Sequence, residues 1–154
     1  MFFKREMTSM RKLVLSLVLL IVGVAYAGAQ SVTQPPQGSR LRKELLDTVR
    51  PVFEKETEGP VEFVVHRLNV MNGWSFGDVF LQRPGGRRID WSRTKYAEDE
   101  KNGAFDPGGS FFLLKQSGSN WTVVEFATGP TDVAWDSWRL DRHLPGQLFE
   151  RELR

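Results

Sequence analysis

The residues best suited to chemistry lie at a Gly-Pro corner near the C-terminal end of the sequence and in a long loop earlier in the chain. The indole faces of tryptophans can stack on the C–H surface of a sugar ring, while carboxylates accept hydrogen bonds from its hydroxyl groups. An aspartate after Gly-Pro also commonly bonds its own backbone to hold a turn, and this structural alternative stays open. The pattern predicts a binding cleft at one end of a sheet, formed by Asp90, Trp91, Asp132, Trp135 and Trp138.

The spacing of the acidic residues and histidines does not indicate a catalytic group. A glycosidase needs two carboxylates at a fixed separation, and nothing selects a pair from Asp90, Asp132 and Asp136. His66 lies in a predicted strand whose expected register places Asp78 on the opposite face, which leaves His66 without a general-base partner. We therefore predict no catalytic residue.

Metal and cofactor sites are not predicted either. The sequence has no cysteine, and its two histidines, His66 and His143, are not at the spacing of zinc ligands. The acidic run that starts at Glu98 is similar to the first half of a calcium loop. However, the twelfth position is Gly109, where a bidentate glutamate is needed.

A cluster of basic residues occupies the same long loop. It consists of Arg87, Arg88, Arg93 and Lys95. Such a cluster could engage an anionic surface, an anionic polymer or a partner protein. Charged side chains on a loop are also commonly just solvated, and the sequence leaves both interpretations open.

The N-terminus predicts export from the cytoplasm. Residues 1–29 combine a basic start, an apolar run from Leu13 to Val24 and a small-residue end, which are the three parts of a secretory signal peptide. The apolar run is shorter than a membrane-spanning helix, so we expect cleavage, no membrane span afterwards, and a periplasmic or extracellular protein. Retention of the segment as an anchor is the alternative.

Removal of the signal peptide changes the charge balance. Residues 1–29 hold four of the 21 basic residues and one of the 19 acidic ones, which leaves 17 basic and 18 acidic residues. A nearly neutral chain gives no global support for a nucleic-acid partner, and none is predicted.

The elements that must position these residues begin with one helix. Residues 30–38 are polar and contain Pro35-Pro36, which predicts a flexible lead. Ser39 is a plausible N-cap, and apolar residues at spacings of three and four predict a helix to about Glu56. Pro51 falls inside this pattern and is expected to kink the helix or to start a new turn.

Two predicted hairpins follow the helix. Asn72-Gly73 predicts a two-residue turn between strands 61–70 and 74–83. Counting outward pairs Met71 with Trp74, Arg67 with Asp78, and Val65 with Phe80.

The second hairpin has strands 110–116 and 121–128, with Gln116 opposite Trp121 and with Phe111 and Phe126 on one face. A short helical turn is possible around residues 91–101 of the loop between the hairpins.

Both faces of the predicted sheet are largely apolar. One face is expected to lie against the helix, and the other must be covered by the long loop, by the C-terminal tail or by a second copy of the chain as a homodimer. The domain is predicted to span residues 39–138, and residues 139–154 are predicted to be an irregular tail. Apolar residues of the tail could still lie back on the sheet.

The sequence therefore predicts an α+β fold in which an N-terminal helix packs on a four-stranded antiparallel sheet of two hairpins. The segments GPVEFVV, QRPGGRRIDW and WTVVEFATGPTDVAW resemble those of small secreted bacterial proteins with a cystatin-like domain, over roughly residues 40–138. The resemblance implies a fold and a compartment, and it implies no catalytic residue. We expect a non-catalytic binding module for an envelope protein or a glycan. The alternative is a small hydrolase or isomerase with a pocket between helix and sheet, using Asp78 or Arg67.

Overall fold

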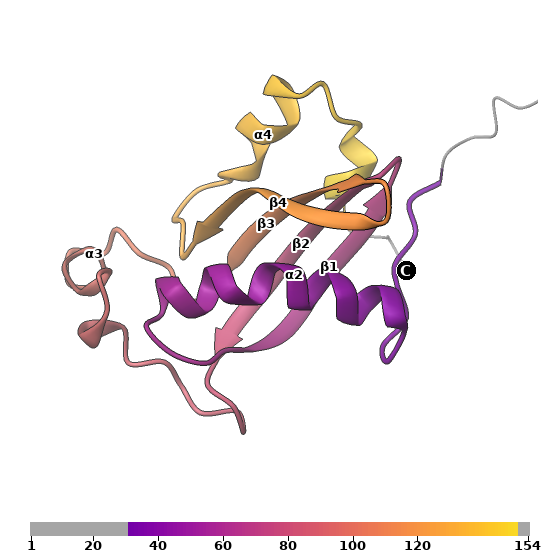
Figure 1. Ribbon diagram of the computed structural model, residues 1–154. Coiled ribbons are helices and arrows are strands. Elements are labelled where there is room, and N and C mark those ends of the chain that lie inside the picture. The colour runs from indigo at the N-terminus through magenta and orange to yellow at the C-terminus, as the bar shows by residue number, and fades with distance from the viewer. Residues whose placement is uncertain (1–30, 151–154) are drawn as a thin grey trace, which may run out of the picture. The chain divides into compact units, whose positions relative to one another are not determined.

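The computed structural model describes residues 31–150, which form an α+β arrangement of one long helix and a four-stranded antiparallel sheet, as predicted (Figure 1). The predicted signal peptide, residues 1–29, lies outside the described residues. The elements follow in the order α2 (Arg40–Glu56), β1 (Glu62–Met71), β2 (Trp74–Gln82), the 3-10 helix η1 (Trp91–Arg93), α3 (Ala97–Lys101), β3 (Ser110–Ser117), β4 (Asn120–Thr128), α4 (Trp135–Asp141) and the 3-10 helix η2 (Gly146–Phe149).

Helix α2 begins where its capping residue predicts. The side chain of Ser39 accepts a hydrogen bond from the backbone N–H of Arg42 at 3.2 Å, which satisfies one of the free donors of the first turn. The helix runs without a break through Pro51 to Glu56. Its buried apolar residues, Leu45, Val49 and Phe53, recur every four positions and face the sheet.

The segment predicted as a flexible lead is attached to the sheet at one point. Thr33 and Val70 exchange two backbone hydrogen bonds, at 2.9 and 2.8 Å, across an isolated antiparallel bridge. Pro35 is buried. The part of the lead from residue 31 onward is therefore partly ordered against the end of β1.

The sheet has the strand order β1-β2-β3-β4, with each strand antiparallel to the next. The first hairpin turns at Asn72 and Gly73, whose φ angles of 53° and 72° are those that a two-residue turn with left-handed residues requires. The predicted pairs Met71 with Trp74 and Arg67 with Asp78 are confirmed.

A β-bulge at His66 changes the register further along the first hairpin. Val65 pairs with Val79, one residue earlier than the predicted Phe80, and His66 is the extra residue of β1. A bulge sets two residues of one strand opposite one residue of the other, so both His66 and Arg67 lie beside Asp78. The prediction that His66 and Asp78 lie on opposite faces is therefore wrong.

A second bulge in β4 has the same effect on the second hairpin. Gln116 pairs with Trp121 as predicted, but the register shifts between Leu113 and Leu114. Phe126 is consequently opposite Phe112, on the helix side of the sheet. The prediction that Phe126 shares a face with Phe111 is wrong for this reason.

The helix-side core fills the space between α2 and the sheet. Phe53 is fully buried, and its ring meets Phe112 at 6.4 Å and Phe126 at 6.2 Å between centroids. Gly77 lets the Phe112 ring lie directly on β2, since a Cβ atom at Gly77 would lie 2.0 Å from that ring. The interface between helix and sheet is solidly packed.

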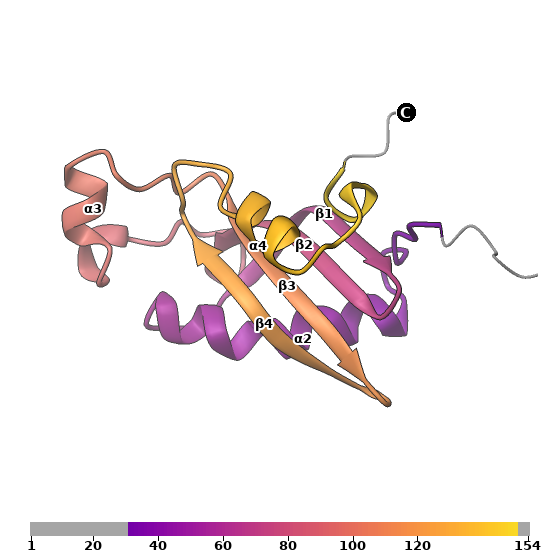
Figure 2. The same ribbon diagram turned by 90° about the horizontal axis from the view of Figure 1, so that it is seen from above.

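The tail covers the opposite face of the sheet (Figure 2). Leu148 and Phe149 are buried there, and the side-chain amide of Asn69 in β1 donates to the carbonyl oxygens of Leu148 and Glu150, both at 2.9 Å. The tail predicted as irregular from residue 139 instead contains the end of α4 and η2. The C-terminal tail, one of the three predicted ways to cover this face, lies on it.

Candidate functional site

The structure does not bring the five residues of the predicted cleft together. Trp91 is buried in the helix-side core, whereas Trp138 is buried in the tail-side core and Trp135 stacks on Phe149 at 5.4 Å between ring centroids. Asp132 is exposed at the corner before α4. The tryptophans thus pack on opposite faces of the sheet, and a single cleft cannot contain them all.

Trp91 holds the long loop in place. Its ring packs against Phe105 at 4.7 Å and Tyr96 at 6.0 Å between centroids. The predicted helical turn in this region is confirmed as η1 and α3. Because Trp91 is fixed in the core, its neighbours Asp90 and Arg93 are carried to the surface at a defined place.

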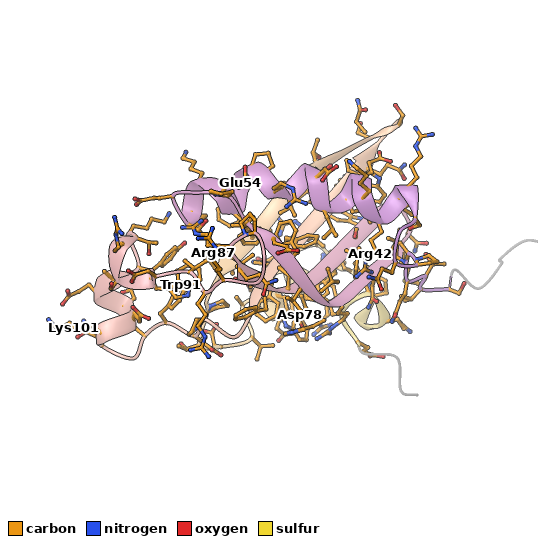
Figure 3. All side chains as sticks on the ribbon, turned by 90° about the horizontal axis from the view of Figure 1, so that it is seen from below. Arg42, Glu54, Asp78, Arg87, Trp91 and Lys101 are labelled. Carbon is orange, nitrogen blue, oxygen red and sulfur yellow. The ribbon has the colours of Figure 1, made fainter. Side chains whose placement is uncertain are left out.

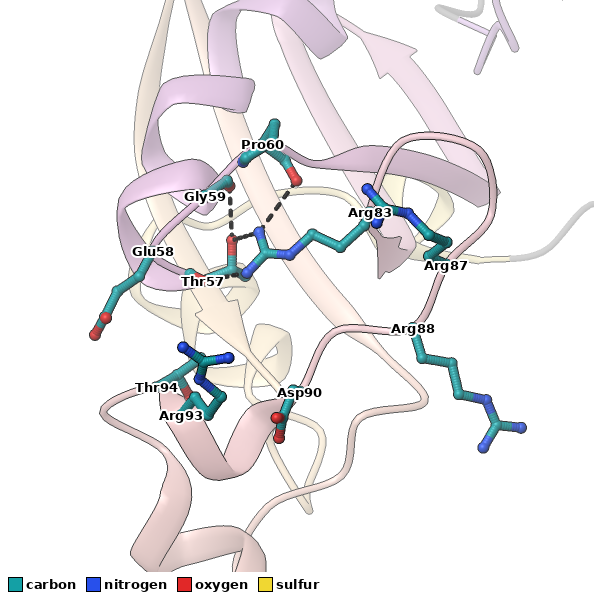
Figure 4. A pocket seen from close by; sticks show the side chains of 10 residues that line it. All are labelled: Thr57, Glu58, Gly59, Pro60, Arg83, Arg87, Arg88, Asp90, Arg93 and Thr94. Atoms are coloured by element: carbon teal, nitrogen blue, oxygen red, sulfur yellow. Dashed lines mark hydrogen bonds between the residues drawn. The ribbon is translucent and has the colours of Figure 1, made fainter.

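A cavity of about 440 Å³ lies where the C-terminal end of α2 meets the start of the long loop (Figure 4). We call it the arginine pocket. Four arginines and two carboxylates contribute to its wall, together with backbone and two threonines. It is lined by Thr57, Glu58, Gly59, Pro60, Arg83, Arg87, Arg88, Asp90, Arg93 and Thr94.

Arg83 forms the fixed wall of the arginine pocket. Its guanidinium donates to the carbonyl oxygens of Thr57 at 2.6 Å and Pro60 at 3.1 Å, and to the Thr57 hydroxyl at 3.3 Å. These bonds join the end of β2 to the turn after α2, where helix carbonyl groups lack partners within the helix. The Arg83 side chain therefore stabilises the fold, and most of its hydrogen-bond donors are already used within the protein.

The other three arginines retain donors for a ligand. Arg87 makes one long bond from Nε to the carbonyl oxygen of Pro84, at 3.5 Å. Arg88 and Arg93 are exposed, and neither makes a side-chain hydrogen bond or ion pair within residues 31–150. Unpaired guanidinium groups around a cavity are suited to an anionic ligand.

The remaining acceptors in the wall are few. The Thr94 hydroxyl donates to the carbonyl oxygen of Trp91 at 2.8 Å, so it is used within the loop. Asp90 accepts from the Ser92 hydroxyl through Oδ1 at 2.5 Å and does not cap η1, which leaves Oδ2 available. Glu58 is exposed beside the turn after α2.

A buried carboxylate beside the pocket fastens the loop to the helix. Glu56, the last residue of α2, lies 2.7 Å from the Lys95 ammonium and accepts a hydrogen bond from the Tyr96 hydroxyl. Burial raises the pKa of Tyr96, and the bond to Glu56 raises it further. The hydrogen bond to Glu56 also raises the pKa of Lys95. Lys95, predicted as part of a basic surface cluster, is thus paired.

The cluster created by the first bulge is the second polar group of interest. Asp78 is buried, with Arg67 at 3.1 Å and the His66 Nδ1 atom at 3.6 Å, and the Arg67 guanidinium lies 5.3 Å from the centre of the Phe76 ring. Phe76 belongs to the tail-side core, so this cluster lies away from α2. In Figure 3, Asp78 is likewise apart from Arg87 and Trp91. Asp78, which the predicted alternative of an enzyme would use in a pocket between helix and sheet, therefore lies on the other face of the sheet and is paired with Arg67.

Residues 31–150 were also searched for clusters of metal ligands and for membrane-spanning helices. No group of three potential ligands among residues 31–150 is arranged to hold a metal ion. Within the same range, none of the helices has the length and apolar character needed to cross a membrane.

Comparison with known proteins adds no assignment. A scan against protein-family models, a search of curated proteins and a search of solved structures each found no match. The site is therefore defined by its own residues. Sequence reasoning selected Arg87, Arg88 and Arg93 as a cluster but did not select Arg83, although it directly precedes the Pro-Gly-Gly turn of the same basic run.

Proposed function

We propose that this protein is a non-catalytic binding module that takes an oxyanion, such as a phosphate, sulfate or carboxylate group, into the arginine pocket. The observation that carries the proposal is the presence of Arg87 and Arg93, with largely unpaired guanidinium groups, at a cavity of about 440 Å³. Arg88 also lines the cavity, and its side chain extends away from the other lining residues in Figure 4, so it must turn inward to contact an anion. Arg83 supports the proposal by fixing one wall of the cavity through three hydrogen bonds.

Guanidinium groups suit this role for a geometric reason. Each presents planar N–H donors that match two oxygens of an oxyanion, and such charge-assisted bonds are stronger than neutral ones. Four arginines against Glu58 and Asp90 leave the lining with an excess of positive charge. A bound anion reduces the repulsion among these arginines as well as pairing with them.

The setting proposed for this activity is the cell envelope or the exterior. The basic and apolar N-terminal segment supports export, with cleavage before residue 30. An envelope glycan or protein that bears an anionic group would then be the natural partner. The helix packed across a four-stranded antiparallel sheet supports the proposed likeness to cystatin-like secreted domains.

Calorimetric titration tests the proposed function. The domain comprising residues 30–154 is titrated with inorganic phosphate and with sulfate at low salt, beside the double variant Arg88→Ala, Arg93→Ala. We expect the double variant to lose at least about tenfold in affinity, since a hydrogen bond to a charged group contributes about 1.5–3 kcal/mol. Arg40→Ala, an exposed arginine at the start of α2, is the matched control and should bind as the unaltered protein does.

Two results would contradict the proposal. One is the absence of any phosphate or sulfate binding by the unaltered domain at low salt. The other is equal binding by the double variant and the Arg40→Ala control, which would show that the anion is attracted by general charge alone.

A further inference from the structure

We infer that the ligand of the arginine pocket is a phosphate monoester of a polyol or sugar, whose hydroxyl groups are bound by Asp90. This inference rests on the proposed function and goes further, because it names what is attached to the anion. It is carried by the groups in the wall that have no partner, by the charge of the lining and by the size of the cavity.

The free acceptors in the wall are the first observation. Two carboxylates in the wall, Asp90 and Glu58, have acceptor oxygens without a partner among residues 31–150, and Asp90 is the one whose orientation is fixed by a hydrogen bond. A pocket for sulfate needs donors only, because sulfate at neutral pH presents acceptor oxygens on every side, whereas hydrogen phosphate still carries an O–H donor. Asp90 nevertheless places a carboxylate in the lining, with Oδ1 held by Ser92 at 2.5 Å and Oδ2 free. A carboxylate beside an anion is favourable only when the ligand also supplies a donor. A protonated phosphate oxygen can supply it, and so can a hydroxyl group on the carbon skeleton of a phosphate ester, for which a cavity of about 440 Å³ has room.

The charge of the lining is the second observation. Four arginines and two carboxylates leave an excess of two positive charges. A phosphate monoester carries about −1.5 to −2 at pH 7, which matches this excess. A ligand that supplied its donor as an ammonium group would cancel part of its own negative charge. The balance therefore favours hydroxyl groups over ammonium groups as the donors.

The size of the cavity is the third observation. Its volume of about 440 Å³ falls in the range of pockets that hold small organic ligands, roughly 300–1,000 Å³. A phosphate group alone would leave most of this space to water. The lining contains no aromatic residue, and Trp91 is buried in the core behind it, so a polyol would be held by polar contacts and not by stacking.

Two phosphate esters of equal charge test the inference. Methyl phosphate carries the anionic group without hydroxyls, and glucose 6-phosphate carries the same group on a hydroxylated ring. We expect the unaltered domain to bind glucose 6-phosphate about tenfold more tightly or better, as hydrogen bonds to a charged group allow. Free glucose, which lacks the anion, should show no measurable binding.

The variant Asp90→Asn separates the two esters. Asparagine can keep the bond to Ser92 through its oxygen, but it presents an N–H₂ donor where the carboxylate offered an acceptor. The preference for glucose 6-phosphate should disappear, and methyl phosphate should bind more tightly because a negative charge has been removed from the wall of the pocket. A purely structural role for Asp90 would weaken both esters equally, and that result would overturn the inference.

The outcomes distinguish the inference from the proposed function beneath it. Equal affinity of the unaltered domain for the two esters overturns the polyol inference and leaves oxyanion binding supported. Binding of neither ester overturns both. The comparison of the two esters on the unaltered protein decides the matter even where Asp90→Asn fails to fold, which its melting temperature would reveal.

Discussion

The guanidinium of Arg83 donates to the carbonyl oxygen of Thr57 at 2.6 Å, and this bond ties the end of β2 to the turn that follows α2. The same side chain also donates to the carbonyl oxygen of Pro60. One arginine therefore joins the turn after α2 to the point at which β2 ends and the long loop begins. The loop is held again at Glu56 by Lys95 and Tyr96. The arginine pocket lies between these two attachments, and its shape depends on both.

Replacement of Arg83 by alanine should therefore affect stability and binding together. The variant leaves the carbonyl oxygens of Thr57 and Pro60 without their donors, and we expect the free energy of unfolding to fall by about 1.5–3 kcal/mol. Phosphate binding should weaken because the wall is no longer fixed. Urea denaturation and calorimetry on the same sample measure the two effects. Unchanged stability would contradict the structural role of Arg83.

Gly77→Ala tests the packing of the helix-side core. The added Cβ atom would lie 2.0 Å from the Phe112 ring, so the ring or the strand must move, and overpacking of this kind typically costs about 1–3 kcal/mol. The double variant Gly77→Ala, Phe112→Leu should recover part of that loss, because the smaller side chain makes room. Additive destabilisation by the two changes would show that they do not meet in the folded protein.

The C-terminal tail is expected to be part of the folded unit. Phe149 is 1% exposed and contacts the rings of Phe76 and Trp135. Its replacement by alanine should lower the free energy of unfolding by about 3–5 kcal/mol. Leu140→Ala is the matched control, since Leu140 is 54% exposed and should change stability by less than about 0.5 kcal/mol. Similar denaturation midpoints for the two variants would contradict the tail packing.

Stability should decline at alkaline pH through Tyr96 and Lys95. Their pKa values in the folded protein are raised above the ordinary 10.0 and 10.5, chiefly by burial for Tyr96 and by the bond to Glu56 for Lys95. Groups with raised folded values give stability that is complete below the unfolded pKa and is lost as the pH rises through the folded pKa. The free energy of unfolding should thus fall above about pH 10.

Tyr96→Phe isolates this contribution. Phenylalanine cannot donate to the buried Glu56 carboxylate, so stability at pH 7 should drop by about 1–3 kcal/mol. The decline at alkaline pH should become shallower, because one of the two titrating groups is gone. Denaturant unfolding at several pH values from neutral to alkaline measures both changes. A decline as steep as that of the unaltered protein would assign the pH dependence to other groups.

Local signals in the sequence predicted where the helix and strands lie. The features that the sequence did not predict, such as the two β-bulges, depend on contacts between residues far apart in the chain. Ser39, Asn72 and Gly73 fix the helix start and the first hairpin through their own backbone preferences. The bulges at His66 and in β4 carry no comparable signal, and each moves later residues to the other face. In each hairpin, the alternation of residues along a strand therefore predicted the facing side chains correctly only between the turn and the bulge.

The sequence predicts one side of the candidate site, the arginine cluster, but not the other side, the turn after α2. Arg87, Arg88 and Arg93 stand close together in the chain and were recognised as a cluster. The wall opposite them comes from the turn after α2, more than twenty residues away, through the bond of Arg83 to Thr57. In the predicted cleft, residues that are near one another or similar in type were grouped, but the fold separates them: Trp91 packs on one face of the sheet and Trp135 on the other.

Mapping of phosphate binding on the protein by NMR tests the central claim most directly. The ¹⁵N-labelled domain is titrated with inorganic phosphate at low salt, and the shifts of its backbone amides are followed. We expect saturable shifts that concentrate at the residues around the arginine pocket, above all Gly59, Arg88, Asp90 and Arg93. Shifts centred instead on the face beneath α4 and η2, or no saturable shifts at all, would contradict this claim.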